Sequence, residues 1–179
     1  TGEHERAPES ENSQKTIKPS VFSEAGGEGF TDGGDDTTSS ASNGHIVGID
    51  PGHQGENVDM SATEPNGPGS STMKAKASTG TRGSFSGLPE YQLNLDISLL
   101  LKDILEQRGY QVVMTRTDND AAISNKERAE LVASQGAEIC VRIHANGDDS
   151  ADVSGALTMC PSQQNPYVSS LYDSSNKLS

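Results

Sequence analysis

The alternation of apolar runs and helical repeats along this chain predicts an α/β fold. Apolar runs of strand length are separated by segments in which apolar residues recur at helical spacing. The expected elements, in chain order, are a strand at 45–50, a helix at 89–108, a strand at 110–115, a helix at 124–135, strands at 137–143 and 154–160, and a helix from Asn165 onward. This order predicts a mixed, mainly parallel sheet flanked by helices, with right-handed crossovers.

The helix at 89–108 has the clearest local signals. Pro89 suits a first helical turn, where its missing N–H loses no bond, and Gly109 supplies a stop. Four apolar residues at spacings of four, three and four are expected to pack on the sheet: Leu93, Ile97, Leu100 and Ile104. The next helix should begin with a capping box formed by Ser124 and Glu127.

A long segment at 54–87 separates the first strand from the first helix. Its glycines and prolines, for example at 67–71, are typical of turns, so we expect a loop. Long loops inside compact domains are uncommon and often functional.

Residues 1–43 differ in composition from the rest of the chain. They contain 9 acidic and 3 basic residues, many Gly, Ser and Thr, and almost no aliphatic residues. Such a segment cannot bury enough apolar surface to offset its ordering entropy, so we expect a disordered, acidic linker. The linker would either space the domain from an anchor or be an uninvolved tail. The folded domain is expected at 44–179.

Charge and hydropathy exclude several classes of protein. The formal net charge is −13 and no run of Lys and Arg is present, which argues against a nucleic-acid partner. No apolar run approaches the ~18 residues of a membrane helix. The two cysteines permit one disulfide, but Cys140 lies in an apolar run and is expected to be a small buried hydrophobe.

Two histidines and a glutamate form the most informative set in the sequence. His53 comes shortly after the first strand, His144 directly follows the strand at 137–143, and Glu90 opens the first helix. Because ligands gather at the carboxyl edge of parallel strands, these three side chains are expected to meet there. Two imidazoles and a carboxylate suit a catalytic zinc ion, which keeps a fourth position open for water.

The residues around this set resemble one enzyme family. Five blocks occur in the order found in zinc-dependent N-acetylmuramoyl-L-alanine amidases of the amidase_3 type, and the long loop is similar to that of secreted, clostridia-like members. The resemblance covers 45–179. The blocks are Asp50-Pro51-Gly52-His53, Pro89-Glu90-Tyr91, Val113-Met114-Thr115-Arg116, Ser124-Asn125-Lys126-Glu127-Arg128-Ala129 and Ile143-His144-Ala145-Asn146.

The resemblance implies a concrete chemistry. Members of this family cleave the amide between N-acetylmuramic acid and the L-alanine of the peptidoglycan stem peptide. It implies Zn²⁺ as cofactor, His53, Glu90 and His144 as metal ligands, peptidoglycan as substrate, and an extracellular or cell-wall location. It also implies a catalytic glutamate on a later strand. No glutamate follows Glu138, so that residue is expected beyond Ser179, in a fold incomplete at its C-terminal end. This chain is then expected to release little or no stem peptide.

Other readings remain open from the residues themselves. Asp50 or backbone carbonyls could orient the imidazole rings, and Arg116 and Arg142 could form salt bridges or meet a substrate carboxylate. Glu64, in the long loop, is the first alternative for proton transfer. Two other functions are possible: a non-catalytic zinc-containing wall-binding module, or a carboxypeptidase-type zinc peptidase. The spacing of 37 residues between His53 and Glu90 counts against the peptidase.

Overall fold

A computed structural model describes residues 41–148, 150 and 152–179. Most of the linker predicted at 1–43 therefore lies outside the described residues. The elements are β1 (Ile46–Pro51), β2 (Thr63–Pro65), β3 (Met73–Ala75), α1 (Glu90–Gln107), β4 (Gln111–Met114), α2 (Asn125–Ser134), β5 (Ile139–Ile143), the 3₁₀ turn η1 (Ser169–Leu171) and α3 (Tyr172–Leu178).

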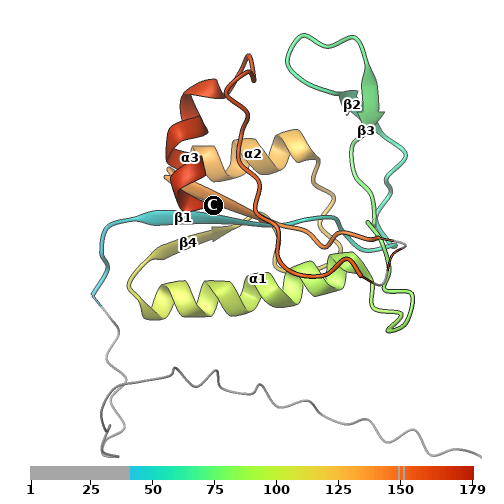
Figure 1. The fold of residues 1–179 in the computed structure, drawn as a ribbon, viewed down its shortest axis with the longest axis horizontal. Coiled ribbons are helices and arrows are strands. Elements are labelled where there is room, and N and C mark those ends of the chain that lie inside the picture. Colours follow the sequence, from blue (N-terminus) through green and yellow to red (C-terminus); the bar gives the residue numbers. More distant parts are fainter. Residues whose placement is uncertain (1–40, 149, 151) are drawn as a thin grey trace, which may run out of the picture. The chain divides into compact units, whose positions relative to one another are not determined.

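The main sheet has the order β4-β1-β5, and both pairings are parallel, which confirms the predicted α/β class. Figure 1 shows α1 and α2 on opposite sides of this sheet. The central strand supplies the buried residues Val47 and Ile49, and Val132 of α2 packs beside it. A Cβ atom at Gly48 would lie 3.0 Å from the Val132 side chain, so the glycine lets α2 approach the sheet closely.

Helix α1 packs on the sheet through a different face from the one predicted. Its buried residues are Glu90, Asn94, Leu95 and Ser98. The predicted apolar stripe stays partly exposed, with Leu100 61% exposed. Two polar side chains explain the difference: Asn94 donates to the Gly52 carbonyl oxygen at 3.2 Å, and the Ser98 hydroxyl donates to the Asn94 carbonyl oxygen of the same helix. Short polar side chains thus bring this face onto the sheet.

The predicted capping box of α2 is present. The Ser124 hydroxyl accepts from the Glu127 N–H, and the Glu127 carboxylate accepts from the Ser124 N–H at 2.7 Å. The glycines that follow α1 and α2 adopt left-handed backbone angles, with φ 84° at Gly109 and 75° at Gly136. Both helices therefore begin and end close to where the sequence predicts.

Three predictions outside the sheet are wrong. The segment 54–87 contains an antiparallel hairpin, β2–β3, whose three-residue strands are too short for a periodicity to reveal. The strand predicted at 154–160 is absent, because this segment pairs with no described strand and leaves Met159 81% exposed. The last helix, expected from Asn165, is preceded by turns and η1, so α3 begins only at Tyr172.

Cys140 is exposed, although its apolar run predicted burial. It lies on β5, at one edge of the sheet, and β5 has no fully buried residue. Both cysteines are free thiols. Among the described residues, no helix combines the length and the hydropathy needed to cross a membrane.

Candidate metal site

The structure brings the side chains of His53, Glu90 and His144 together at the carboxyl edge of the sheet. His53 follows β1, His144 follows β5, and Glu90 is the first residue of α1. The His53 Nε2, His144 Nδ1 and Glu90 Oε1 atoms form a triangle with sides of 3.1, 3.1 and 3.2 Å. This group could hold a metal ion.

Glu90 is held as an ionised acceptor. Its side chain is only 4% exposed. One carboxylate oxygen accepts from the Thr81 N–H at 2.8 Å, and the other accepts from the Ala145 N–H at 3.0 Å. Burial alone would raise the pKa of Glu90, but these bonds and the contact with His144 outweigh it and lower the pKa to about 2. Glu90 therefore offers a negative charge to the site at any physiological pH.

His53 is fixed both in its backbone and in its ring. Its φ angle is 65°, the only positive φ of a non-glycine residue in the described part of the chain. Such a backbone is uncommon and clusters at functional sites. The ring Nδ1 lies 3.1 Å from the Ser78 carbonyl oxygen, which leaves Nε2 directed at Glu90 and His144. Burial lowers the pKa of His53 below 6.5, partly offset by Glu90, so the ring favours the neutral form that binds metals.

Two glycines leave room for the three side chains. A Cβ atom at Gly80 would lie 2.5 Å from the Glu90 carboxylate and 2.6 Å from the His53 ring. A Cβ atom at Gly52 would lie 2.5 Å from the His144 ring. No side chain fits at these distances, so both positions are restricted by the site itself. Gly80 also has φ 75°, which favours glycine.

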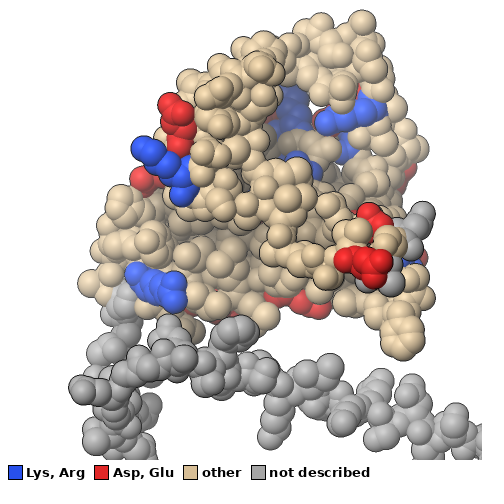
Figure 2. All heavy atoms as spheres, viewed as in Figure 1, with Lys and Arg blue, Asp and Glu red and all other residues tan. Residues whose placement is uncertain are grey.

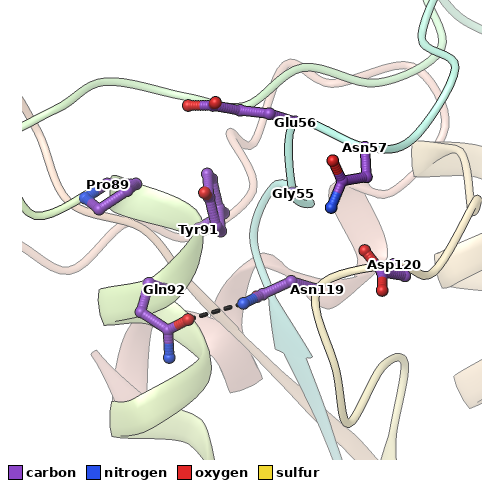
Figure 3. Close-up of a pocket in the computed structure, with 8 residues that line it drawn as sticks. All are labelled: Gly55, Glu56, Asn57, Pro89, Tyr91, Gln92, Asn119 and Asp120. Carbon is purple, nitrogen blue, oxygen red and sulfur yellow. Dashed lines mark hydrogen bonds between the residues drawn. The ribbon is translucent and has the colours of Figure 1, made fainter.

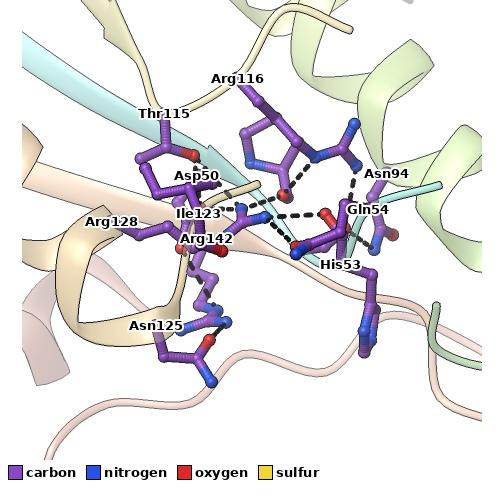
Figure 4. Close-up of polar contacts among 12 residues, drawn as sticks. Asp50, His53, Gln54, Asn94, Thr115, Arg116, Ile123, Asn125, Arg128 and Arg142 are labelled. Carbon is purple, nitrogen blue, oxygen red and sulfur yellow. Dashed lines mark hydrogen bonds and ion pairs between the residues drawn. The ribbon is translucent and has the colours of Figure 1, made fainter. Parts of the chain in front are cut away.

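A buried guanidinium group anchors the loop that carries His53 (Figure 4). Arg128 of α2 is 2% exposed. It forms an ion pair with Asp50 at 2.7 Å and donates to the carbonyl oxygens of Pro51 at 2.7 Å and His53 at 2.8 Å. It also bonds the Gln54 side chain at 2.8 Å. Arg128 thereby ties α2 to the end of β1 and to the loop that follows.

Arg116, just after β4, acts on the same loop from the other side. It is 3% exposed and donates to the carbonyl oxygens of Pro51 and Gly52, both at 3.0 Å, and of Tyr91 at 2.7 Å. Burial, together with the charge of Arg128, lowers the pKa of Arg116 to about 10, so the group stays charged at neutral pH. Its donors are used on backbone carbonyl oxygens and on the Asn119 side chain, which makes its role structural.

Asp50 acts on the site through arginines rather than by touching an imidazole ring. It accepts from Thr115 at 2.6 Å and pairs with Arg128 and, at 3.3 Å, with Arg142. The Nε of Arg142 donates to His144 Nε2 at 3.0 Å. This bond assigns the ring proton of His144 to Nδ1, the atom that faces Glu90. Metal binding through Nδ1 would therefore require this proton to leave and the contact with Arg142 to break.

A hollow of about 170 Å³ opens beside the three side chains. Its walls include His53 and His144, and its basic side chains are Lys76, Arg128 and Arg142. Figure 2 shows Lys and Arg side chains around a hollow between the hairpin and α2. Glu64 does not line it: this residue is buried on β2, with a carboxylate oxygen 3.6 Å from the Lys74 ammonium nitrogen.

Sequence reasoning missed several residues that shape the site. Ser78, Gly80 and Thr81 lie in the long segment expected to be a loop, and no motif singles them out. Arg128 belonged to a recognised block, but the sequence of this short, mostly polar helix gives no sign that the arginine is buried. A buried arginine needs acidic and carbonyl partners, and the end of β1 supplies them.

The fold and the site together define an α/β protein that presents a His-Glu-His group, able to hold a metal ion, at the carboxyl edge of a parallel sheet. Residues 47–177 match the model of the Amidase_3 family, N-acetylmuramoyl-L-alanine amidase. The chain belongs to this family.

Individual relatives agree with this assignment. The chain is 37% identical to N-acetylmuramoyl-L-alanine amidase LytC of Bacillus subtilis (strain 168) over 73 residues. This match covers 41% of the chain and 14% of LytC. Among solved structures it is similar to the N-acetylmuramyl-L-alanine amidase Ami1 of Mycobacterium abscessus, with 34% identity and a TM-score of 0.53. The Ami1 of Mycobacterium smegmatis gives 32% identity and a TM-score of 0.54.

The matches cover 59% and 61% of this chain, and 49% and 50% of the two Ami1 chains. The chain thus corresponds to about half the length of these solved relatives.

Proposed function

We propose that this chain forms the zinc-binding part of a peptidoglycan amidase that cleaves the amide between N-acetylmuramic acid and the L-alanine of the stem peptide. The observation that carries the proposal is the triangle of His53 Nε2, His144 Nδ1 and Glu90 Oε1, with sides of 3.1–3.2 Å. Membership of the amidase family supplies the substrate class.

The size of the triangle supports zinc. A tetrahedral zinc ion 2.0–2.1 Å from each ligand places the ligand atoms roughly 3.3–3.4 Å apart. The observed sides are within a few tenths of an ångström of this spacing. Two imidazole nitrogens and one carboxylate oxygen are also a donor set found in catalytic zinc sites, which keep a fourth position open.

Each residue of the site then has a defined task. Bound zinc supplies a Lewis acid that polarises the scissile carbonyl and lowers the pKa of water. Glu90 brings the negative charge. The Ser78 carbonyl oxygen accepts a hydrogen bond from Nδ1 of His53 and thereby orients the ring. Among the described residues, no Asp or Glu lines the hollow beside the three candidate ligands, where a proton-transfer group would act. A positioned proton-transfer group contributes about 10²–10⁴-fold to such reactions, so this chain should be slow.

The location follows from the substrate. Peptidoglycan lies outside the cytoplasmic membrane, so we place the protein in the cell wall or the extracellular space. The net charge of −13 and the absence of a run of Lys and Arg argue against a nucleic acid as partner.

Zinc content tests the ligand assignment. The full chain should bind one zinc ion, measured by elemental analysis after dialysis, and His53→Ala and His144→Ala should each lose it. His45→Ala is the matched control, because His45 is exposed and pairs with Glu138 at 3.1 Å, away from the site. Equal zinc content in the parent and both site variants would refute the assignment.

Product analysis tests the reaction. The zinc-loaded chain is incubated at high concentration with a muramyl peptide, and products are identified by mass spectrometry. Slow release of a peptide with a free L-alanine amino group, lost after zinc removal, is the expected result. Free C-terminal amino acids would indicate a carboxypeptidase. Retention on purified walls with no cleavage above the zinc-free control would indicate a binding module and overturn the proposal.

A further inference from the structure

A second hollow, of about 410 Å³, lies at the carboxyl edge of the sheet, the edge that also carries the metal site. Its lining comes from three places: the loop after β1, the start of α1 and the loop after β4 (Figure 3). Pro89 and Tyr91, which flank Glu90 in the chain, belong to this lining, and so does Gly55, two residues after His53. A molecule bound in this hollow would therefore lie at the same edge of the sheet as the candidate metal site, although none of the three candidate ligands lines the hollow.

Part of the polar lining is already engaged. The Asn119 amide donates to the Gln92 side chain at 2.6 Å, as drawn in Figure 3, and Gln92 donates in turn to Asp96 at 2.7 Å. The Glu56 carboxylate pairs with Arg82 at 2.5 Å. These contacts build a fixed wall and neutralise one of the two acidic groups.

Three polar groups of the lining remain available. The Asn57 amide, the Asp120 carboxylate and the Tyr91 hydroxyl form no hydrogen bond with another described residue. In Figure 3, Asn57 and Asp120 lie on one side of the hollow and the Tyr91 ring lies between them and Pro89. An amide offers both donors and acceptors, and a carboxylate offers acceptors only. The phenol adds a flat apolar face with a polar tip.

We infer that this hollow is a subsite for a neutral sugar ring of the glycan strand. A carboxylate and an amide can share the vicinal hydroxyl or N-acetyl groups of a hexosamine, while the Tyr91 ring packs against its carbons. No Lys or Arg of the described part of the chain lines the hollow, and Asp120 would repel an anion, so the carboxylates of a stem peptide fit poorly. The inference rests on the proposed function, because the glycan adjoins the scissile amide.

Sugar binding can be measured separately from cleavage. The probe is the β-1,4-linked trisaccharide of N-acetylglucosamine, which carries no lactyl group and no peptide amide. It is titrated into the full chain and followed by calorimetry or by NMR chemical shifts. We expect saturable binding that Asn57→Ala and Asp120→Ala each weaken at least about fivefold. Both residues are exposed, so neither variant should disturb the fold. Asp103→Ala, an exposed acidic residue later in α1, is the matched control and should bind like the parent.

The outcomes separate this inference from the proposed function. Binding should survive His53→Ala, because the hollow does not use that side chain; loss of binding in this variant would place the sugar at the metal site and overturn the inference. Absence of trisaccharide binding, or equal binding by the parent, Asn57→Ala and Asp120→Ala, would overturn it even where zinc binding and amide cleavage are found. If a lysine-containing peptide binds at Asp120 more tightly than the trisaccharide does, the hollow is a site for an ammonium group and the inference is overturned.

Discussion

Replacing Arg128 by methionine should destabilise the protein strongly. Methionine keeps much of the length of the side chain but removes its charge and its donors. Arg128 is 2% exposed and forms its ion pair with Asp50 at 2.7 Å, so the substitution leaves a buried carboxylate without its main partner. The carbonyl oxygens of Pro51 and His53 lose donors in the same step.

The structure sets the size of this effect. Removing one partner of a buried ion pair costs about 3–5 kcal/mol. Asp50 keeps its bond from Thr115 at 2.6 Å and a longer contact with Arg142, which favours the lower end of the range. We expect the free energy of unfolding to fall by about 3 kcal/mol, an increase of roughly 150-fold in the unfolding equilibrium constant. For a domain of this size the midpoint of thermal unfolding should fall by roughly 10 °C.

Urea unfolding followed by circular dichroism measures the loss, with a chelator present so that zinc does not contribute. Lys126→Met on the same helix is the matched control. Its side chain is 73% exposed and pairs with Glu130 at 3.5 Å, so its removal should change the free energy by less than about 0.5 kcal/mol. The reasoning is refuted if Arg128→Met is as stable as Lys126→Met. Adding Asp50→Asn to Arg128→Met should cost less than the sum of the two single changes, because the pair acts as a unit.

Further predictions address the site and α2. Gly80→Ala should lower zinc affinity at least about tenfold in a competitive titration, since its Cβ atom would lie 2.5 Å from a ligand carboxylate; unchanged affinity would refute the packing argument. Arg142→Met should raise zinc affinity severalfold, because its guanidinium competes for the ring of His144; a lower affinity would refute this. Ser124→Ala should reduce the free energy of unfolding, measured by urea unfolding, by about 1 kcal/mol. An unchanged value would show that the cap does not stabilise α2. Hydrogen bonds from Ser124 hold the pKa of Glu127 below 4.5, so its stabilising effect is present above that pH and lost as the pH falls. Parent and Glu127→Gln should therefore converge in stability in acid, and a constant difference would contradict this.

The fold was predictable where a local signal and the tertiary environment agree. Strand β1 and both long helices have an apolar run, a capping residue or a glycine stop that acts within a few residues. The segment 154–160 shows the opposite case. Its sequence suits a strand, but a strand needs a partner, and this segment pairs with neither open edge of the described sheet, β4 or β5. Likewise the apolar run around Cys140 predicts a strand correctly, whereas its burial depends on what covers the edge of the sheet.

The three candidate ligands were predictable because the topology of a parallel sheet carries them to one edge. What places their donor atoms was not predictable, because it depends on long-range contacts with segments that have no pattern of their own. Gly80 matters only because it touches His53 and Glu90, and Ser78 only because its carbonyl oxygen meets a ring nitrogen. Neither residue is distinctive until the fold has brought it to the site.

The strained backbone of His53 follows from the same long-range contacts. A left-handed conformation costs a non-glycine residue of order 1–3 kcal/mol unless its surroundings enforce it. Here three successive carbonyl oxygens, those of Pro51, Gly52 and His53, accept hydrogen bonds from Arg116 or Arg128, at distances of 2.7–3.0 Å. Two buried guanidinium groups thus fix the loop after β1 and, with it, the direction of the His53 ring. Because protein contacts already set the direction of this ring, a metal ion would spend little of its binding free energy on arranging His53.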